Sequence, residues 1–193
     1  ISELKKWLKK LSISSGKLQC GIHSPLDINS SNKLFLSGIL PDQLYNNCAG
    51  KHLAMLSACL SNNLNIENYL SFDHTYQLQI REVLEYFTEK KINKKNFALD
   101  GCSAPQYAFK LSDLTLALIN LMKSYFGKKN YTKETNLLLK NILNYPMMIG
   151  GTNNFDSNLI KLLSKNIFCK YGAEGVFLFA HLNKKIVGVI KVE

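Results

Sequence analysis

Two short segments of the sequence carry cysteines and a lysine at spacings that suit a metal ion. In the block N-N-C-A-G-K-H at 46–52, Cys48 and Lys51 are three positions apart. Apolar residues from about 48 to 62 predict a helix, which would place both side chains on one face of its first turn. The positive helix end should lower the pKa of a thiol or an amine there, and thiolate and neutral amine are the metal-binding forms. A half-buried cysteine beside a solvated lysine is the alternative.

The second segment is the block D-G-C-S-A-P at 100–105, which follows a predicted short strand at 97–99. Its Cys102 would lie in a tight turn, where a buried structural thiol is the alternative interpretation. If both segments meet, they supply two sulfurs and one nitrogen with an open position for water, the pattern of a catalytic zinc site. Asp100 would then be the natural partner of the Lys51 amine.

A third segment, K-Y-G-A-E-G at 170–175, precedes two β-rich runs at 176–182 and 186–192. These runs predict an antiparallel hairpin joined at Asn183-Lys184. Lys170 would extend from the strand edge, as the lysine of the K-T-G element does in β-lactamases and penicillin-binding proteins. A surface lysine in a lysine-rich chain is the alternative.

The rest of the chain is mainly helical in pattern. Apolar spacing predicts helices at 2–11, 31–37, 48–62, 74–90, 112–126 and 133–144. Asp73 is a candidate cap for the fourth of these, and Asp156 or Ser157 could cap a further short helix through Leu163. Helices followed by a terminal hairpin predict one α+β domain over residues 1–193.

Composition excludes several classes of protein. With 46% hydrophobic and 20% charged residues the chain can bury a core, and Lys+Arg of 24 against Asp+Glu of 14 gives a net charge of +10. The lysines occur in scattered pairs without an interleaved aromatic and basic face, so we expect no nucleic-acid partner. No apolar run reaches the ~18 residues of a membrane span. Five cysteines without an export signal predict a cytoplasmic location rather than a disulfide framework.

Five blocks together resemble the zinc-dependent L-asparaginases of the rhizobial, thermolabile type. They are C-G-I-H-S-P at 20–25, the block at 46–52, the pair Y-L at 69–70 with D-H at 73–74 and Gln77, the block at 100–105 and the block at 170–175. The resemblance implies a fold like that of serine β-lactamases, hydrolysis of L-asparagine to L-aspartate and ammonia, and a homodimer. It also implies a Zn²⁺ ion bound by Cys48, Lys51 and Cys102.

The resemblance gives three further residues a role. Lys170 is expected to be catalytic, paired with a serine near the substrate. His52 and Asp100 are expected to take part in substrate binding, with a core histidine as the alternative for His52.

The sequence also departs from that family. In that family the nucleophile lies in an S-x-x-K segment near the amino terminus. The present sequence has two such strings, at 14–17 and 30–33, but both lie outside the expected helical context. We therefore expect an amino-terminally truncated member with its nucleophile upstream, inactive alone; a catalytically inactive zinc- or amino-acid-binding remnant is the alternative. Ala49 stands where serine is common, and Asn154 stands where an arginine for the substrate carboxylate is expected.

Overall fold

The fold is known from a computed structural model, which describes residues 1–163 and 165–192. The described residues form eight α-helices and two small antiparallel sheets. They divide into two compact units, Ile1–Glu82 with Ile92–Ala108, and Val83–Lys91 with Phe109–Glu193. Helix α4 (Thr75–Thr88) begins in the first unit and ends in the second. This division does not test the expectation of a single domain, which stays a prediction.

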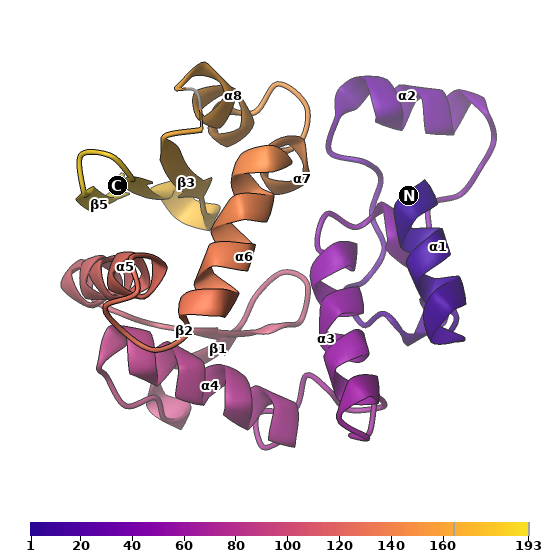
Figure 1. Cartoon of the computed structure of the whole chain (residues 1–193). Coiled ribbons are helices and arrows are strands. Elements are labelled where there is room, and N and C mark those ends of the chain that lie inside the picture. The colour runs from indigo at the N-terminus through magenta and orange to yellow at the C-terminus, as the bar shows by residue number, and fades with distance from the viewer. Residues whose placement is uncertain (164, 193) are drawn as a thin grey trace. The chain divides into compact units, whose positions relative to one another are not determined.

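The first unit contains the indigo-to-purple helices of Figure 1 and a two-stranded hairpin. Its elements are α1 (Ser2–Leu11), α2 (Ile28–Leu36), α3 (Ala49–Ser61), the start of α4, β1 (Phe97–Leu99) and β2 (Pro105–Tyr107). Its core gathers around α3, where Leu53, Leu56 and Cys59 are fully buried. These positions recur at helical spacing, which is why the sequence pattern predicted this helix.

The second unit packs helices around a three-stranded sheet. Its elements are α5 (Leu111–Tyr125), α6 (Thr132–Asn144), α7 (Met147–Gly150), α8 (Phe155–Leu162), β3 (Ile167–Tyr171), β4 (Val176–His181) and β5 (Ile186–Lys191). The sheet is antiparallel in the order β3-β4-β5, and α8 lies against β3 (Figure 1). Leu139, Ile160 and Ala180 are fully buried between helices and sheet.

The predicted α+β class is confirmed, as is the terminal hairpin, now β4 and β5. The sequence analysis missed β3, which pairs with β4 so that Lys170 lies opposite Leu178 and Cys169 opposite Phe179. Lys170 is therefore the second-last residue of an edge strand and not a residue ahead of the first strand.

Two predicted helix caps were wrong. At the start of α4, the Tyr76 N–H donates to His74 Nδ1 at 3.1 Å, while Asp73 pairs with Lys94 at 3.3 Å. At the start of α8, the cap is Asn154, whose side-chain oxygen accepts the Phe155 N–H at 2.8 Å. Asp73 pairs with Lys94 and Asp156 accepts a hydrogen bond from β3, so neither carboxylate caps its own helix.

None of the helices in the described residues is both long and apolar enough to cross a membrane.

Candidate functional site

The start of α3 is held in place by an asparagine of the same block. Cys48 directly precedes the helix, and its N–H donates to the side-chain oxygen of Asn46 at 2.8 Å. The Asn46 amide in turn donates to the Cys20 carbonyl at 2.6 Å. Asn46 is buried and its polar atoms are satisfied, so it fixes the position of Cys48 relative to the 20–25 block.

The turn after β1 is built on the side chain of Asp100. Its Oδ1 accepts the Cys102 N–H at 2.6 Å, and its backbone carbonyl accepts the Ser103 N–H at 2.9 Å. Ser103 has a left-handed φ of 65°, which the tight turn requires. The turn leaves Asp100 Oδ2 free to face another element.

That element is α3. Lys51 Nζ donates to Asp100 Oδ2 at 3.0 Å, and the amide of Gln106 on β2 donates to the same oxygen at 3.1 Å. One residue further along α3, His52 Nε2 lies 3.2 Å from Cys102 Sγ. The structure thus brings together residues that are about fifty positions apart in the sequence.

His52 is fully buried, and both of its ring nitrogens have partners. Its Nδ1 lies 2.6 Å from the hydroxyl of Tyr69, which accepts the Gln19 N–H at 2.9 Å. The Tyr69 hydrogen then needs an acceptor, and Nδ1 is the one available, which places the imidazole hydrogen on Nε2, pointing at the Cys102 sulfur. His52 is thus placed to act on the site through Cys102, and its expected contact with substrate stays a prediction.

The charges of the cluster are set by mutual contact. Burial lowers the pKa of Lys51, but hydrogen bonds with Asp100 and Cys102 outweigh burial and raise it. The helix end was expected to lower the Lys51 pKa, whereas the contacts with Asp100 and Cys102 raise it. Burial raises the pKa of Asp100, yet hydrogen bonds from Cys102 and Lys51 bring it down to about 2. An ammonium and a carboxylate therefore face each other at neutral pH.

The groups behind this ion pair are neutral. Burial first, and the Lys51 charge second, lower the pKa of His52 to about 4. Burial, followed by the Asp100 carboxylate, raises the pKa of the Cys102 thiol to about 11. Burial also raises the pKa of Tyr69 to about 12.

Two thiols and an amine are donor types that zinc accepts once they are deprotonated. Lys51 donates to Asp100 in the turn that carries Cys102, and Cys48 directly precedes the helix of Lys51. The described residues contain no group of three His, Cys, Asp or Glu side chains placed to hold a metal. The metal role of Cys48, Lys51 and Cys102 stays a prediction.

Lys170 belongs to the other compact unit. Its side chain is half-exposed, lies with Nζ 3.4 Å from Asp156 Oδ2 and donates to the Tyr171 carbonyl. Cys169 is fully buried on the opposite side of β3, as the alternation of a strand predicts. Asn154 caps α8 and donates to the Gly150 carbonyl at 2.8 Å, and its expected effect on the substrate carboxylate stays a prediction.

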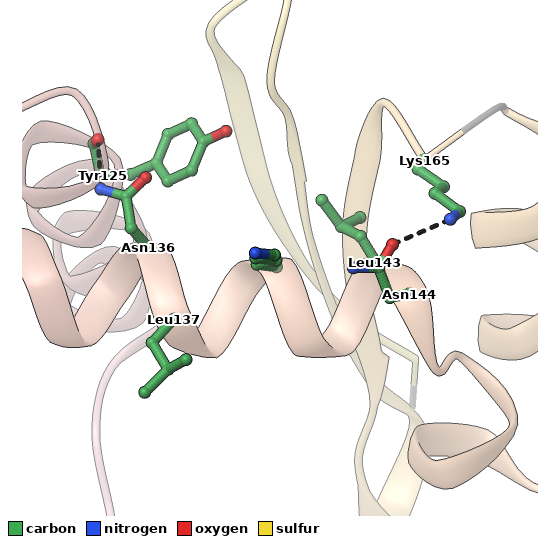
Figure 2. Close-up of a pocket in the computed structure, with 7 residues that line it drawn as sticks. Tyr125, Asn136, Leu137, Leu143, Asn144 and Lys165 are labelled. Atoms are coloured by element: carbon green, nitrogen blue, oxygen red, sulfur yellow. Dashed lines mark hydrogen bonds between the residues drawn. The ribbon is translucent and has the colours of Figure 1, made fainter.

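A hollow of about 500 Å³ in the second unit contains none of the predicted site residues. It is lined by Tyr125, Asn136, Leu137, Lys140, Leu143, Asn144 and Lys165. Figure 2 shows it along α6, with Tyr125 and Asn136 at one end and the bonded pair of Lys165 and Asn144 at the other. Its lining carries no carboxylate or thiol.

Sequence reasoning missed four residues that bear on the candidate groups. Asn46 and Tyr69 belong to the quoted blocks, so their position in those blocks was a usable signal. Gln106 and Asp156 had no such signal, because each meets its partner only through tertiary contact.

The two units define an α+β protein in which perturbed thiol, amine and carboxylate groups gather around a helix start, as they do in enzyme sites. The model of the L-asparaginase II family matches residues 1–193, so the chain belongs to this family. The family is one of amidohydrolases with L-asparagine as substrate. No curated protein matches the chain.

Proposed function

We propose that this protein is an L-asparaginase that converts L-asparagine and water to L-aspartate and ammonia, on a serine β-lactamase-like fold, as a cytoplasmic homodimer. Family membership supports the reaction. The observation that carries the proposal for this chain is the contact between α3 and the turn at 100–104, through the Lys51–Asp100 and His52–Cys102 pairs.

Cys48, Lys51 and Cys102 would hold the zinc ion. When bound, zinc would orient the substrate and polarise its amide carbonyl. Asp100 accepts a hydrogen bond from Lys51, and His52 donates to the Cys102 sulfur, so each of these ligands is oriented by a partner behind it.

Asp100 is also suited to substrate binding. Its side chain is 28% exposed and stays ionised, so its negative charge can attract the α-ammonium group of asparagine. Lys51 and Gln106 both donate to its Oδ2, and the Cys102 N–H donates to its Oδ1, so three hydrogen bonds orient the carboxylate.

Lys170 would serve the serine nucleophile. In its neutral form the amine takes the hydroxyl proton while the serine oxygen bonds to the side-chain carbonyl carbon of asparagine. The carbon–nitrogen bond then breaks, and the nitrogen leaves as ammonia after receiving that proton. Water adds to the resulting ester, which releases aspartate and restores the serine.

The test compares two buried thiols of the same core. In the full-length protein we expect Cys102→Ala to lower bound zinc at least tenfold and to raise KM for asparagine, because a ligand sulfur is lost. Cys59→Ala should leave both quantities nearly unchanged, since Cys59 is fully buried on α3 among apolar groups. Zinc is measured by mass spectrometry and activity by ammonia release.

Equal zinc loss in both variants would mean that general destabilisation, and not ligand loss, causes the effect. If the full-length protein binds asparagine in calorimetry but releases no ammonia, it is a catalytically inactive binding remnant and not an enzyme.

A further inference from the structure

Asp156 is the one fully buried carboxylate among the described residues, and its contacts do not serve its own helix. It lies in the first turn of α8, where a carboxylate usually accepts helix N–H groups. Here Oδ2 instead accepts the Tyr171 N–H at 2.9 Å and lies 3.4 Å from Lys170 Nζ. Both contacts reach across to the last two residues of β3.

The other oxygen of Asp156 gives a second indication. Oδ1 is buried and has no hydrogen-bond partner in the described part of the chain. Burying an unsatisfied polar atom costs free energy, so the position of this carboxylate calls for an explanation beyond its own helix.

The surroundings of Asp156 fix its position closely. The neighbouring Ser157 is also fully buried and donates to the Pro146 carbonyl at 2.9 Å. The Asp156 carbonyl accepts the Cys169 thiol at 3.8 Å, which adds a second connection between α8 and β3. The carboxylate therefore cannot move away from the end of β3 without disturbing both elements.

We propose that Asp156 is the positioning residue of Lys170, holding its amine at the end of the edge strand β3 from a buried, fixed carboxylate. The inference rests on the proposed function, in which Lys170 serves the nucleophile. Lysine has a long flexible side chain, so an anchor at its amine removes conformations that would place it away from the serine.

The test uses Asp156→Asn, which keeps the shape and an acceptor for Tyr171 but removes the charge. Lysines of the full-length protein are labelled by reductive ¹³C-methylation, and the Lys170 signal is assigned by its loss in Lys170→Arg. We expect the chemical shift of the Lys170 signal to change and its line to narrow, because the amine is no longer held beside a fixed carboxylate. Glu134→Gln, which removes an exposed carboxylate on α6, should leave the signal unchanged.

Activity gives an independent measurement. We expect kcat of Asp156→Asn to fall about tenfold or more, with a smaller change in KM, because the amine is held less well. The acidic limb of the pH profile should move, because the carboxylate charge beside the amine is lost. A purely structural residue would lower the amount of folded enzyme without moving that limb.

If Asp156→Asn does not fold, Lys170→Met tests the same pair from the other side. Loss of the ammonium should shift the ¹³C carboxyl signal of Asp156, because the amine next to its Oδ2 is gone. An unchanged Lys170 signal in Asp156→Asn, or an unchanged Asp156 carboxyl signal in Lys170→Met, would overturn the inference. Full ammonia release by Lys170→Met would instead overturn the catalytic role of Lys170, while a shifted carboxyl signal would still establish the pair.

Discussion

At the scale of single residues, a chain of hydrogen bonds runs through the first unit from the Gln19 N–H through Tyr69 and His52 to Cys102. Its members at Tyr69 and His52 are fully buried, and each hydrogen has one acceptor. Such a network fixes a single arrangement of side chains when every hydrogen bond is formed, and breaking one of the bonds lowers the stability of the fold. His52 therefore holds the Cys102 side chain in one orientation.

We predict that Tyr69→Phe destabilises the protein by about 1–3 kcal/mol, because it leaves the buried His52 Nδ1 without a partner and removes the acceptor of the Gln19 N–H. Urea unfolding followed by circular dichroism measures the change. The variant should also lose the Nε2–H tautomer preference of His52, which ¹⁵N NMR of the imidazole detects.

Tyr76→Phe is the matched control, since Tyr76 packs against the same core and its hydroxyl makes no hydrogen bond in the described residues. Its free energy of unfolding should stay near that of the wild type. If both variants lost the same stability, removal of any tyrosine hydroxyl from this core would lower the free energy of unfolding. The chain of hydrogen bonds would then not explain the loss in Tyr69→Phe.

The residue types of the candidate site could be predicted from sequence, but their distances could not. Cys48 and Lys51 share a helical turn, so their proximity follows from local spacing. Lys51 and Asp100 are 49 positions apart, and only the packing of α3 against the turn at 100–104 brings them to 3.0 Å. The resemblance alone linked the two segments, and the raised pKa of Lys51 follows from that contact and not from its helix.

At the scale of elements, helices were easier to predict than strands. The helix at 2–11 matches α1, and those at 112–126 and 133–144 match α5 and α6 within one residue, because long apolar periodicity is a strong local signal. Strand β3 was missed because five residues carry little periodicity and its partner β4 lies further along the chain. Helix α2 begins three residues before the predicted start, since Asp27 caps it through the Ser30 N–H at 2.9 Å.

Close packing of α7 against α8 requires a glycine at position 150. A Cβ atom there would lie 2.7 Å from Ser157 Oγ and 3.2 Å from its backbone nitrogen. We predict that Gly150→Ala lowers the free energy of unfolding by about 1–3 kcal/mol, because a buried hydroxyl and the α8 backbone must both move. Thermal or urea unfolding measures the loss.

Gly16→Ala provides the comparison, because Gly16 is exposed and the added Cβ would meet only Ser14 Oγ at an ordinary 3.7 Å. Its stability should be unchanged or slightly higher, since alanine restricts the unfolded chain. Should Gly150→Ala prove as stable as Gly16→Ala, the contact between α7 and α8 would be looser than the structure indicates.

At the scale of the whole molecule, two separate groups of buried side chains raise the question of cooperativity. One surrounds Leu53 and Leu56 in the first unit, and the other surrounds Leu139 and Ile160 in the second. The helix α4 contributes residues to both units, so the loss of either unit would leave part of this helix without its packing. A helix of this length is marginal in water without tertiary contacts.

We therefore predict that the two units unfold in one transition. The single tryptophan, Trp7 on α1, reports on the first unit by fluorescence, while Leu139→Ala creates a cavity in the second. Truncation of a fully buried leucine costs about 2–5 kcal/mol of stability. In a chain that unfolds cooperatively, probes in both units report this loss. The midpoint of the Trp7 transition in urea should fall by the same amount as the midpoint measured by circular dichroism. A Trp7 transition that stays at its wild-type midpoint in Leu139→Ala would establish two independently folding domains and refute the expectation of one.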